Sequence, residues 1–257
     1  MQAGRHKLKV VFNYFWKTMS NDLVNILKSA DFHNVVPFDP AKEKLVALDF
    51  TENNTELTDD ILLDTGKFSV YIKNKLAKAN AKYGIGGYAE HRTIYRRSTL
   101  FNETKLLMPG QNMHEEPRRF HLAIDIWGKL FTPVMAPLDG KVHSFAFNNR
   151  FSDYGATIIL SHRLENFSFY TLYGHLSLAS IKSMSEGMSI NKGDVFAEFG
   201  IPQENGNWPP HLHFQIIKDM QGMKGDYPGV CQFSERETYL ANCPDADLIL
   251  RMMDYAN

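Results

Sequence analysis

The chain has 257 residues, enough for one large domain or for a catalytic domain with a smaller partner. Hydrophobic residues make up 44% and charged residues 22%, a composition that is ordinary for a globular protein and argues against disorder. The 28 basic and 29 acidic residues give a formal net charge of -1, so no nucleic acid or other polyanion is expected as a partner.

The N-terminal residues resemble an export signal only superficially. An apolar run over residues 10–16 follows several basic side chains, but Asn13 interrupts it and no small-residue cleavage site comes after it. Asp22 begins an amphipathic pattern instead, and no other apolar stretch is long enough to span a bilayer. We therefore expect a cytoplasmic protein without a membrane span.

Residues 1–117 are expected to form a mixed α/β region. Apolar residues at helical spacing predict helices over 16–30 and 67–82, with Gly84 as the stop signal of the second helix. A short strand is predicted between them, over 44–50. The polar stretch over 108–119 predicts a loop and contains the candidate domain boundary.

Residues 118–257 have a different texture. Short apolar runs such as ATIILSH and LHFQII alternate with Gly, Pro, Asn and Asp, which is typical of antiparallel strands joined by turns. Residues 235–253 are expected to form a helical tail. The predicted fold class is therefore α+β, with a mainly antiparallel β domain after a mixed α/β N-terminal region. The only cysteines, Cys231 and Cys243, are too few for a secreted disulfide scaffold, and the sequence leaves open whether they pair.

The segment PPHLHFQII places His211 and His213 two residues apart on a predicted strand. Alternate strand residues share a face, with Cα atoms roughly 6.6 Å apart, so both imidazoles can enter one cleft. One ring can then bind a metal while the other stands beside it. Two polar residues at this spacing also occur on solvent-facing edge strands, so the pair alone is weak evidence.

A second pair, His121 and Asp125, supplies an imidazole and a carboxylate. A fully extended chain would separate their Cα atoms by roughly 13 Å, too far for one ion, so the segment must bend, bulge or be helical. Ile124 and Trp127 favour a strand, and we expect His121 on the incoming loop and Asp125 on that strand. Two histidines and one aspartate leave a fourth tetrahedral position open, as in a catalytic zinc site.

Other histidines are candidates for moving protons. The histidine of the His-x-His pair that does not bind metal lies next to the ligand, and His175 ends the run FYTLYGHLS, in which Tyr173 is expected on the same strand face. Tyr173 could contribute an oxyanion hydrogen bond, although a packing role is the alternative. His91, His143 and His162 lack such partners in sequence and are expected to be structural or solvated.

An ordered set of segments between residues 120 and 217 resembles LytM/lysostaphin-type zinc metallopeptidases. These segments are HLAID, TPVMAPLDGKV, DYGATIILSH, FYTLYGHLS, EGMSINKGDVFAEFG and PHLHF. The resemblance implies zinc held by His121, Asp125 and His213, and His175 and His211 as catalytic histidines. It also implies an antiparallel β scaffold that hydrolyses a peptide bond, usually in peptidoglycan, so a peptide or muropeptide is the expected substrate and an endopeptidase-like reaction the expected activity.

The sequence departs from this family at two places, which concern the substrate more than the metal. The turn before His-x-His is NWPP over residues 207–210 rather than rich in Ser, Thr and Gly, and Gln215 stands where Glu is usual. Two alternatives stay open: a cytoplasmic hydrolase of another small amide, and a non-catalytic interaction module of the same fold.

The N-terminal region is expected to be either a packing appendage or a lid or substrate wall. The segment over 86–92 favours a lid or substrate wall, because it combines two glycines with Glu90 and Arg92, a composition found in binding loops. We therefore include Glu90 and Arg92 among the candidate substrate contacts. The sequence makes no prediction of the oligomeric state.

Overall fold

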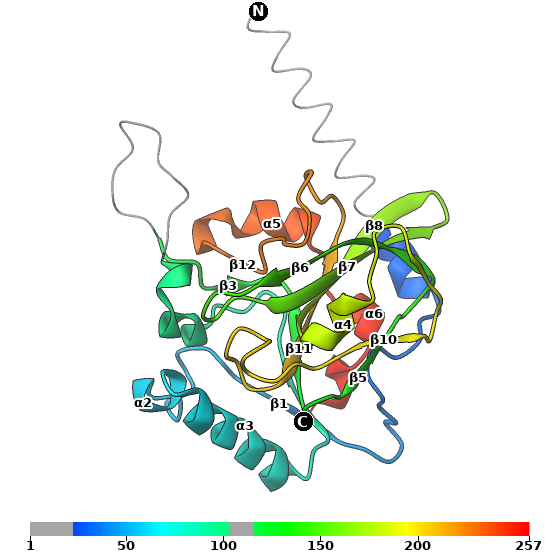
Figure 1. Cartoon of the computed structure of the whole chain (residues 1–257). Helices are drawn as coiled ribbons and strands as arrows, with labels where there is room; N and C mark the ends of the chain where they lie inside the picture. Colours follow the sequence, from blue (N-terminus) through cyan, green and yellow to red (C-terminus); the bar gives the residue numbers. More distant parts are fainter. Residues whose placement is uncertain (1–22, 103–115, 257) are drawn as a thin grey trace, which may run out of the picture.

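The computed structural model describes residues 23–102 and 116–256, and its centre is an eight-stranded sheet in the order β1-β2-β4-β11-β8-β7-β6-β9 (Figure 1). Every pair in this sheet is antiparallel except β1 with β2. The predicted α+β class with a mainly antiparallel sheet is confirmed. The strands are β1 (Leu45–Ala47), β2 (Tyr83–Gly86), β4 (Ile124–Trp127), β6 (Gly140–Asn148), β7 (Gly155–Leu164), β8 (Phe167–Leu176), β9 (Ser189–Ile190) and β11 (His211–Ile217).

Smaller elements surround this sheet. Two further sheets have two strands each: β3 (Phe120–His121) with β12 (Val230–Cys231), and β5 (Pro133–Met135) with β10 (Val195–Glu198). The α-helices are α2 (Asp59–Leu62), α3 (Thr65–Ala79), α4 (Leu178–Lys182), α5 (Arg236–Asn242) and α6 (Asp247–Leu250). The 3-10 helices are η1 (Thr93–Arg97), η2 (Thr99–Phe101), η3 (Phe233–Glu235) and η4 (Met253–Tyr255). The helical tail predicted over 235–253 consists of α5 and α6, with η3 before them and η4 after them.

Helix α3 forms as its apolar spacing predicts, but it ends earlier than expected. Asp64 caps its first turn by accepting a hydrogen bond from the amide of Lys67 at 3.0 Å, and Phe68 and Ile72 form its buried face. The helix ends at Asn80, which adopts the left-handed conformation with φ of 48°. Gly84 is therefore not the stop signal: it lies in β2, where a Cβ atom would clash with a neighbouring leucine side chain.

The other N-terminal predictions hold in part. The strand expected over 44–50 is the shorter β1. Residues 23–29 are helical, and the beginning of the helix predicted over 16–30 lies outside the described residues, as does most of the loop predicted over 108–119. Cys231 and Cys243 are buried and are not joined by a disulfide.

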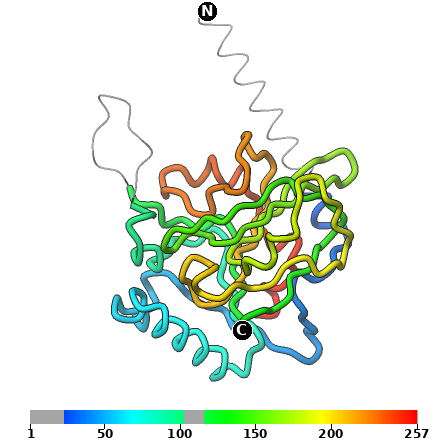
Figure 2. Tube along the Cα trace, in the orientation of Figure 1, coloured from blue at the N-terminus to red at the C-terminus, as the bar shows by residue number. Residues whose placement is uncertain are grey.

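The N-terminal region is part of the central sheet. Strand β1 pairs with β2, and β2 pairs with β4 so that Gly86 lies opposite Asp125. Figure 2 shows the lighter-blue and cyan N-terminal segments running along the lower side of the green and yellow parts of the chain. An aromatic cluster joins the two parts, because Phe68 of α3 packs against Trp127 and Trp208 with ring centroids 5.8 and 6.3 Å apart. The sheet and its core therefore continue across the boundary predicted at residue 117.

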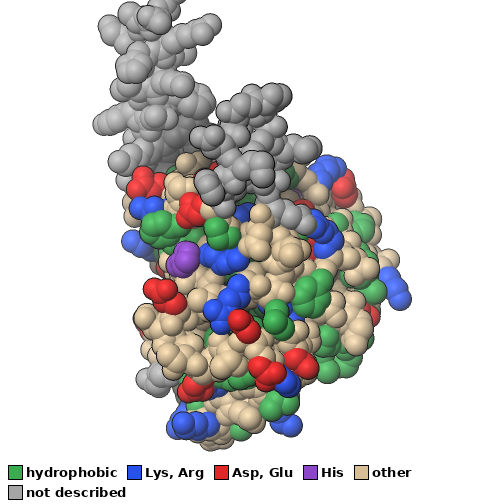
Figure 3. Space-filling model, turned by 90° about the vertical axis from the view of Figure 1, so that its left-hand side faces the viewer, with side chains coloured by type: hydrophobic (Ala, Val, Ile, Leu, Met, Phe, Trp, Pro, Cys, Tyr) green, Lys and Arg blue, Asp and Glu red, His purple; other side chains and the backbone are tan. Residues whose placement is uncertain are grey.

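Surface charge and helix length were the two remaining features of the fold with a counterpart in the composition. On the described part of the face drawn in Figure 3, basic and acidic side chains are interspersed. Within residues 23–102 and 116–256, no helix has the length and apolar character needed to cross a membrane.

His162 is a structural histidine of β7, as its sequence context predicted. It is 3% exposed, its Nδ1 lies 2.9 Å from the carbonyl oxygen of Asp139, and its Nε2 lies 2.6 Å from Oγ1 of Thr171. Burial lowers the pKa of His162 to about 4. The folded protein therefore keeps this ring neutral. As the pH falls, His162 takes up a proton in the unfolded chain before it does so in the folded protein.

We expect this histidine to make folding stability depend on acid. Because the pKa is lower in the folded than in the unfolded state, the contribution is intact above about pH 6.5 and is lost as the pH falls towards 4. Between pH 7 and pH 5 the free energy of unfolding should drop by ~2 kcal/mol more in the wild type than in H162Q. Urea unfolding at both pH values measures this difference, with H33Q, a change at an exposed histidine, as the control. Equal pH dependence in the wild type and H162Q would contradict it.

Candidate metal centre

Three side chains that are far apart in the sequence meet at one point. His121 Nε2 lies 3.2 Å from His213 Nδ1 and 3.3 Å from Asp125 Oδ1, and His213 Nδ1 lies 3.1 Å from Asp125 Oδ1. All three residues are at most 3% exposed. Ligand atoms about 2.0–2.1 Å from a tetrahedral zinc ion are about 3.3–3.4 Å from one another, so this arrangement fits zinc. The structure thus brings together the ligand set that the sequence predicted.

Strand register explains this convergence. His213 of β11 is the direct partner of Asp125 of β4, so both side chains leave the sheet on the same face. The chain bends at Leu122 and Ala123, between β3 and β4, and this bend turns His121 back towards Asp125. His121 itself lies in β3, paired with Val230, and not in a loop as expected, because β12 supplies a pairing partner that the local sequence does not reveal.

Hydrogen bonds on the far side of each ring determine which nitrogen faces the centre. His121 Nδ1 lies 3.3 Å from the carbonyl oxygen of Gly87, and His213 Nε2 lies 3.1 Å from Oε1 of Gln215. A neutral histidine that donates from one nitrogen presents a lone pair on the other, which is the form that binds a metal. Burial, aided by the Arg92 cation, lowers the pKa of His121 to about 3.

Asp125 stays ionised in spite of its burial. Burial alone would raise its pKa, but the Arg92 cation paired with its Oδ2 holds the pKa of this carboxyl well below its usual range. An ionised carboxylate beside two imidazole nitrogens is the donor set expected of a zinc site with an open position.

His175 and His211 lie beside the three ligands without belonging to them. Their rings stack on each other with centroids 4.0 Å apart, and His211 stacks on Trp127 at 3.9 Å. Each ring places Nδ1 2.8 Å from a backbone carbonyl oxygen, that of Asn205 for His175 and that of Pro209 for His211. In the neutral rings Nδ1 therefore donates and Nε2 carries the lone pair.

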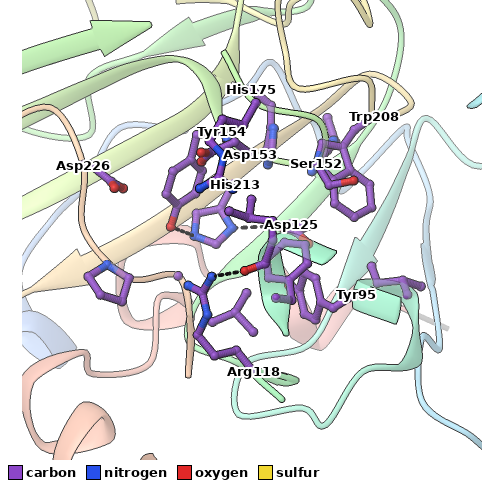
Figure 4. Close-up of a pocket in the computed structure, with 18 of the residues that line it drawn as sticks. Tyr95, Arg118, Asp125, Ser152, Asp153, Tyr154, His175, Trp208, His213 and Asp226 are labelled. Atoms are coloured by element: carbon purple, nitrogen blue, oxygen red, sulfur yellow. Dashed lines mark hydrogen bonds and ion pairs between the residues drawn. The ribbon is translucent and has the colours of Figure 1, made fainter. Parts of the chain in front are cut away.

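Both rings are kept neutral by their surroundings. Burial lowers the pKa of His211 to about 4 and the pKa of His175 well below its usual value. Both residues line the cavity next to Asp125 and His213, and Figure 4 shows His175 there. They are therefore placed to accept a proton there.

Tyr173 does not share a face with His175: it has the packing role, and the alternative oxyanion contact is not formed. The register of β7 with β8 shifts between Ala156 and Ile158, and His175 has a φ of 64°, so β8 bulges before its last residues. As a result Gly174 lies opposite His213, while Tyr173 points into the core and packs on Phe214 with ring centroids 5.3 Å apart.

Tyr154 occupies the position by the ligands that was expected of Tyr173. Its hydroxyl lies 3.4 Å from His213 Nε2 and donates a hydrogen bond to the carbonyl oxygen of Tyr227 at 3.0 Å. The ring fits because Gly174 has no side chain: a Cβ atom there would lie 2.6 Å from Cδ1 of Tyr154. The sequence shows Tyr154 only as part of DYGATIILSH, and no spacing rule connects it with His213.

Glu90 and Arg92 also lie elsewhere than expected. Arg92 is fully buried and donates from Nη1 to Asp125 Oδ2 at 2.5 Å and from Nε to Glu90 Oε2 at 2.6 Å. Neither residue lines the cavity. The fold therefore does not bring Glu90 and Arg92 to the cavity as expected of substrate contacts, because Arg92 is buried behind a metal ligand and Glu90 pairs with it.

A cavity of about 250 Å³ opens beside the ligands (Figure 4). One wall is largely apolar and includes four residues of the N-terminal region and the tryptophan of the NWPP turn: Ile94, Tyr95, Leu100, Phe101 and Trp208. The rest of the lining includes charged side chains of both signs: Arg118, Arg150, Asp153 and Asp226. The cavity thus offers both apolar and ionic contacts next to the candidate metal site.

Comparisons with known proteins match the part of the chain that carries the three ligands. The model of "Peptidase family M23" matches residues 119–225. A protein of Haemophilus influenzae described as "Uncharacterized metalloprotease" is 27% identical over 139 residues, which are 52% of this chain and 27% of that protein. The chain therefore spans only about a quarter of the length of this curated relative.

Two solved structures are similar over part of the chain. A zinc-containing peptidase from Vibrio cholerae is 26% identical, with 38% of this chain and 27% of that chain covered and a TM-score of 0.31. The catalytic domain of lysostaphin from Staphylococcus simulans is 19% identical, with 66% and 96% covered and a TM-score of 0.36.

Proposed function

Because residues 119–225 form a LytM-type domain of peptidase family M23, as the ordered segments predicted, we propose that the protein is a metallopeptidase. Its proposed metal is zinc, and its proposed substrates are the peptide bonds of peptidoglycan or muropeptides. One observation carries the proposal. Three ligand atoms lie 3.1–3.3 Å apart beside a cavity that two further neutral histidines line. A non-catalytic module would need neither the group of metal ligands nor the two neutral histidines beside it.

The residues around the cavity divide the chemistry between them. Zinc, when held by His121, Asp125 and His213, supplies a Lewis acid that polarises the scissile carbonyl and acidifies a water molecule. His175 and His211 offer unprotonated Nε2 atoms that can take the proton of the attacking water and return it to the leaving amine.

Tyr154 completes this proposal for the reaction. Its hydroxyl lies beside His213 at the cavity, and by turning its one proton from the Tyr227 carbonyl oxygen it can donate a hydrogen bond to the oxygen on which negative charge develops. We propose this role for Tyr154 in place of Tyr173, which the core encloses.

The N-terminal region, in this proposal, is a substrate wall. It supplies Tyr95 and Phe101 to the apolar side of the cavity, and Asp153 and Asp226 lie on the lining beyond them. Apolar and ionic contacts together suit a short peptide with free amino and carboxyl groups. A cytoplasmic location, in which recycled muropeptides or another small amide would be the substrate, remains part of the proposal.

Cleavage of defined muropeptides tests the function. Zinc-loaded protein is incubated with a panel of crosslinked and uncrosslinked muropeptides, and the products are followed by mass spectrometry. We expect cleavage at a peptide bond that stops when a chelator removes the metal and returns when zinc is restored. Cleavage of simple amides alone would favour the small-amide hydrolase. A zinc-loaded protein that cleaves neither class would favour the non-catalytic module.

A further inference from the structure

We propose that Arg92 is a positioning residue of the metal centre, which occupies one oxygen of Asp125 and leaves the other oxygen to the metal. The inference rests on the metal site of the proposed function and on no particular substrate. It assigns a role at the centre to a residue that lies outside the region matched by the family model, residues 119–225.

Arg92 is held by three acceptors and is not free to reach the substrate cavity. Its side chain is 0% exposed, and its Nη1, Nε and Nη2 atoms donate to Asp125, Glu90 and the carbonyl oxygen of Gly87 respectively. The distance from Nη2 to the Gly87 oxygen is 3.2 Å. A planar guanidinium presents donors on three separate nitrogens in a fixed plane and satisfies all three acceptors at once, whereas the three N–H donors of a lysine radiate from a single nitrogen.

The two oxygens of Asp125 have different partners. Oδ2 accepts from Arg92, whereas Oδ1 lies 3.1 Å from His213 Nδ1 and 3.3 Å from His121 Nε2. Because Arg92 occupies Oδ2, the carboxylate is held in one orientation with only Oδ1 directed at the other ligand atoms. Partners of this kind, one step behind the metal ligands, commonly determine metal affinity.

The missing side chain of Gly86 leaves the space that the Arg92 guanidinium occupies. Gly86 of β2 lies opposite Asp125, and a Cβ atom at this position would lie 2.6 Å from Nη2 of Arg92. Gly86 is not among the glycines with positive φ, so the room for Arg92, and not the backbone conformation, requires a glycine there. The Phe50 ring lies on the guanidinium at 5.3 Å, which completes the enclosure.

Charge balance also favours this role. A fully buried cation is costly unless it is paired, and Arg92 is paired with two carboxylates, those of Glu90 and Asp125. Glu90 pairs with Nε of Arg92 while Asp125 pairs with Nη1, so the cation stays neutralised with Oδ1 of Asp125 facing the other ligand atoms. The residues that support Asp125 lie within 86–92, which makes the N-terminal region a structural part of the metal centre.

Metal binding by substituted proteins tests the inference. Zinc affinity is measured by competition with a chromophoric chelator for the wild type, R92M, R92K and G86A, with R96M as the control. Arg96 belongs to the neighbouring 3-10 helix, is 43% exposed and pairs with Asp59 away from the centre. We expect roughly 10- to 100-fold weaker zinc binding in R92M, R92K and G86A, and wild-type affinity in R96M.

A second measurement separates positioning from general support of the fold. Cobalt(II) is loaded in place of zinc, and its visible absorption reports the ligand set. In R92K the freed Oδ2 of Asp125 becomes available to the metal, so the spectrum should change although the positive charge is retained. If R92M does not fold, the double variant R92M/E90Q, which removes both charges, is used and should show the same loss of affinity.

Two outcomes would overturn the inference. Wild-type zinc affinity and an unchanged cobalt spectrum in R92M would show that Asp125 needs no partner. Full wild-type behaviour of R92K would show that only the charge matters and not the orientation. The readout is metal binding, so a protein that depends on Arg92 for zinc but cleaves no peptide would refute the proposed function alone.

Discussion

Changing His121, Asp125 or His213 to Ala is expected to lower zinc affinity by more than about a hundredfold and to abolish hydrolysis. Changes one step behind metal ligands already cost roughly 10- to 100-fold, so loss of a ligand should cost more. In the part of the chain that the structure describes, these three side chains are the only group of three or more His, Cys, Asp or Glu that could hold a metal ion. Elemental analysis of the purified variants measures the zinc content.

The controls separate loss of a ligand from loss of the fold. D125A also leaves Arg92 with one carboxylate fewer, so D125N, which keeps an oxygen for Arg92, is compared with it. H91A changes an exposed histidine and should retain zinc. Stoichiometric zinc in all three ligand variants would refute the assignment.

Changing His175 or His211 to Ala should reduce turnover roughly a hundredfold to ten-thousandfold while zinc content stays near one per chain. General acid–base assistance has this magnitude. The rings bind backbone carbonyls through Nδ1 and belong to no ligand set, so their loss removes a proton acceptor and not a metal donor. Zinc content and turnover are measured on the same preparation of each variant.

Packing is the main confounding effect, and a second substitution addresses it. His211 is stacked between Trp127 and His175, so H211A leaves a gap that H211F fills with a ring lacking nitrogen. We expect H211F to be as inactive as H211A. If H211A loses its metal, His211 is a ligand and the division between His211 and His213 is wrong. If both alanine variants turn over at the normal rate, neither histidine moves protons in the reaction.

Several features of the protein could be predicted from local sequence. The apolar period of α3 and the alternation in β11 depend on neighbours within a few residues, so the pattern alone predicts a helix and a strand with His211 and His213 on one face. The requirement for a bend between His121 and Asp125 follows from the length of an extended chain. The ordered segments from residue 120 to 217 then carried the metal ligands and both catalytic candidates.

Other features depend on contacts between distant parts of the chain. The bulge in β8 separates Tyr173 from His175, and it forms where Tyr154 packs over Gly174, a contact that no spacing in FYTLYGHLS indicates. Gly84 lies in a strand because β2 finds a partner in β4, which overrides the local preference of glycine for helix ends.

Arg92 shows most clearly what only the tertiary structure decided. In the sequence it stands in a glycine-rich polar segment, which is typical of an exposed binding loop. Pairing of β2 with β4 brings this segment behind Asp125, 33 residues away, and the space above Gly86 lets the guanidinium reach the carboxylate. Sequence periodicity shows which face of an element is buried, but the partner of a buried charge depends on which strands pair, and that is determined by packing of the whole chain.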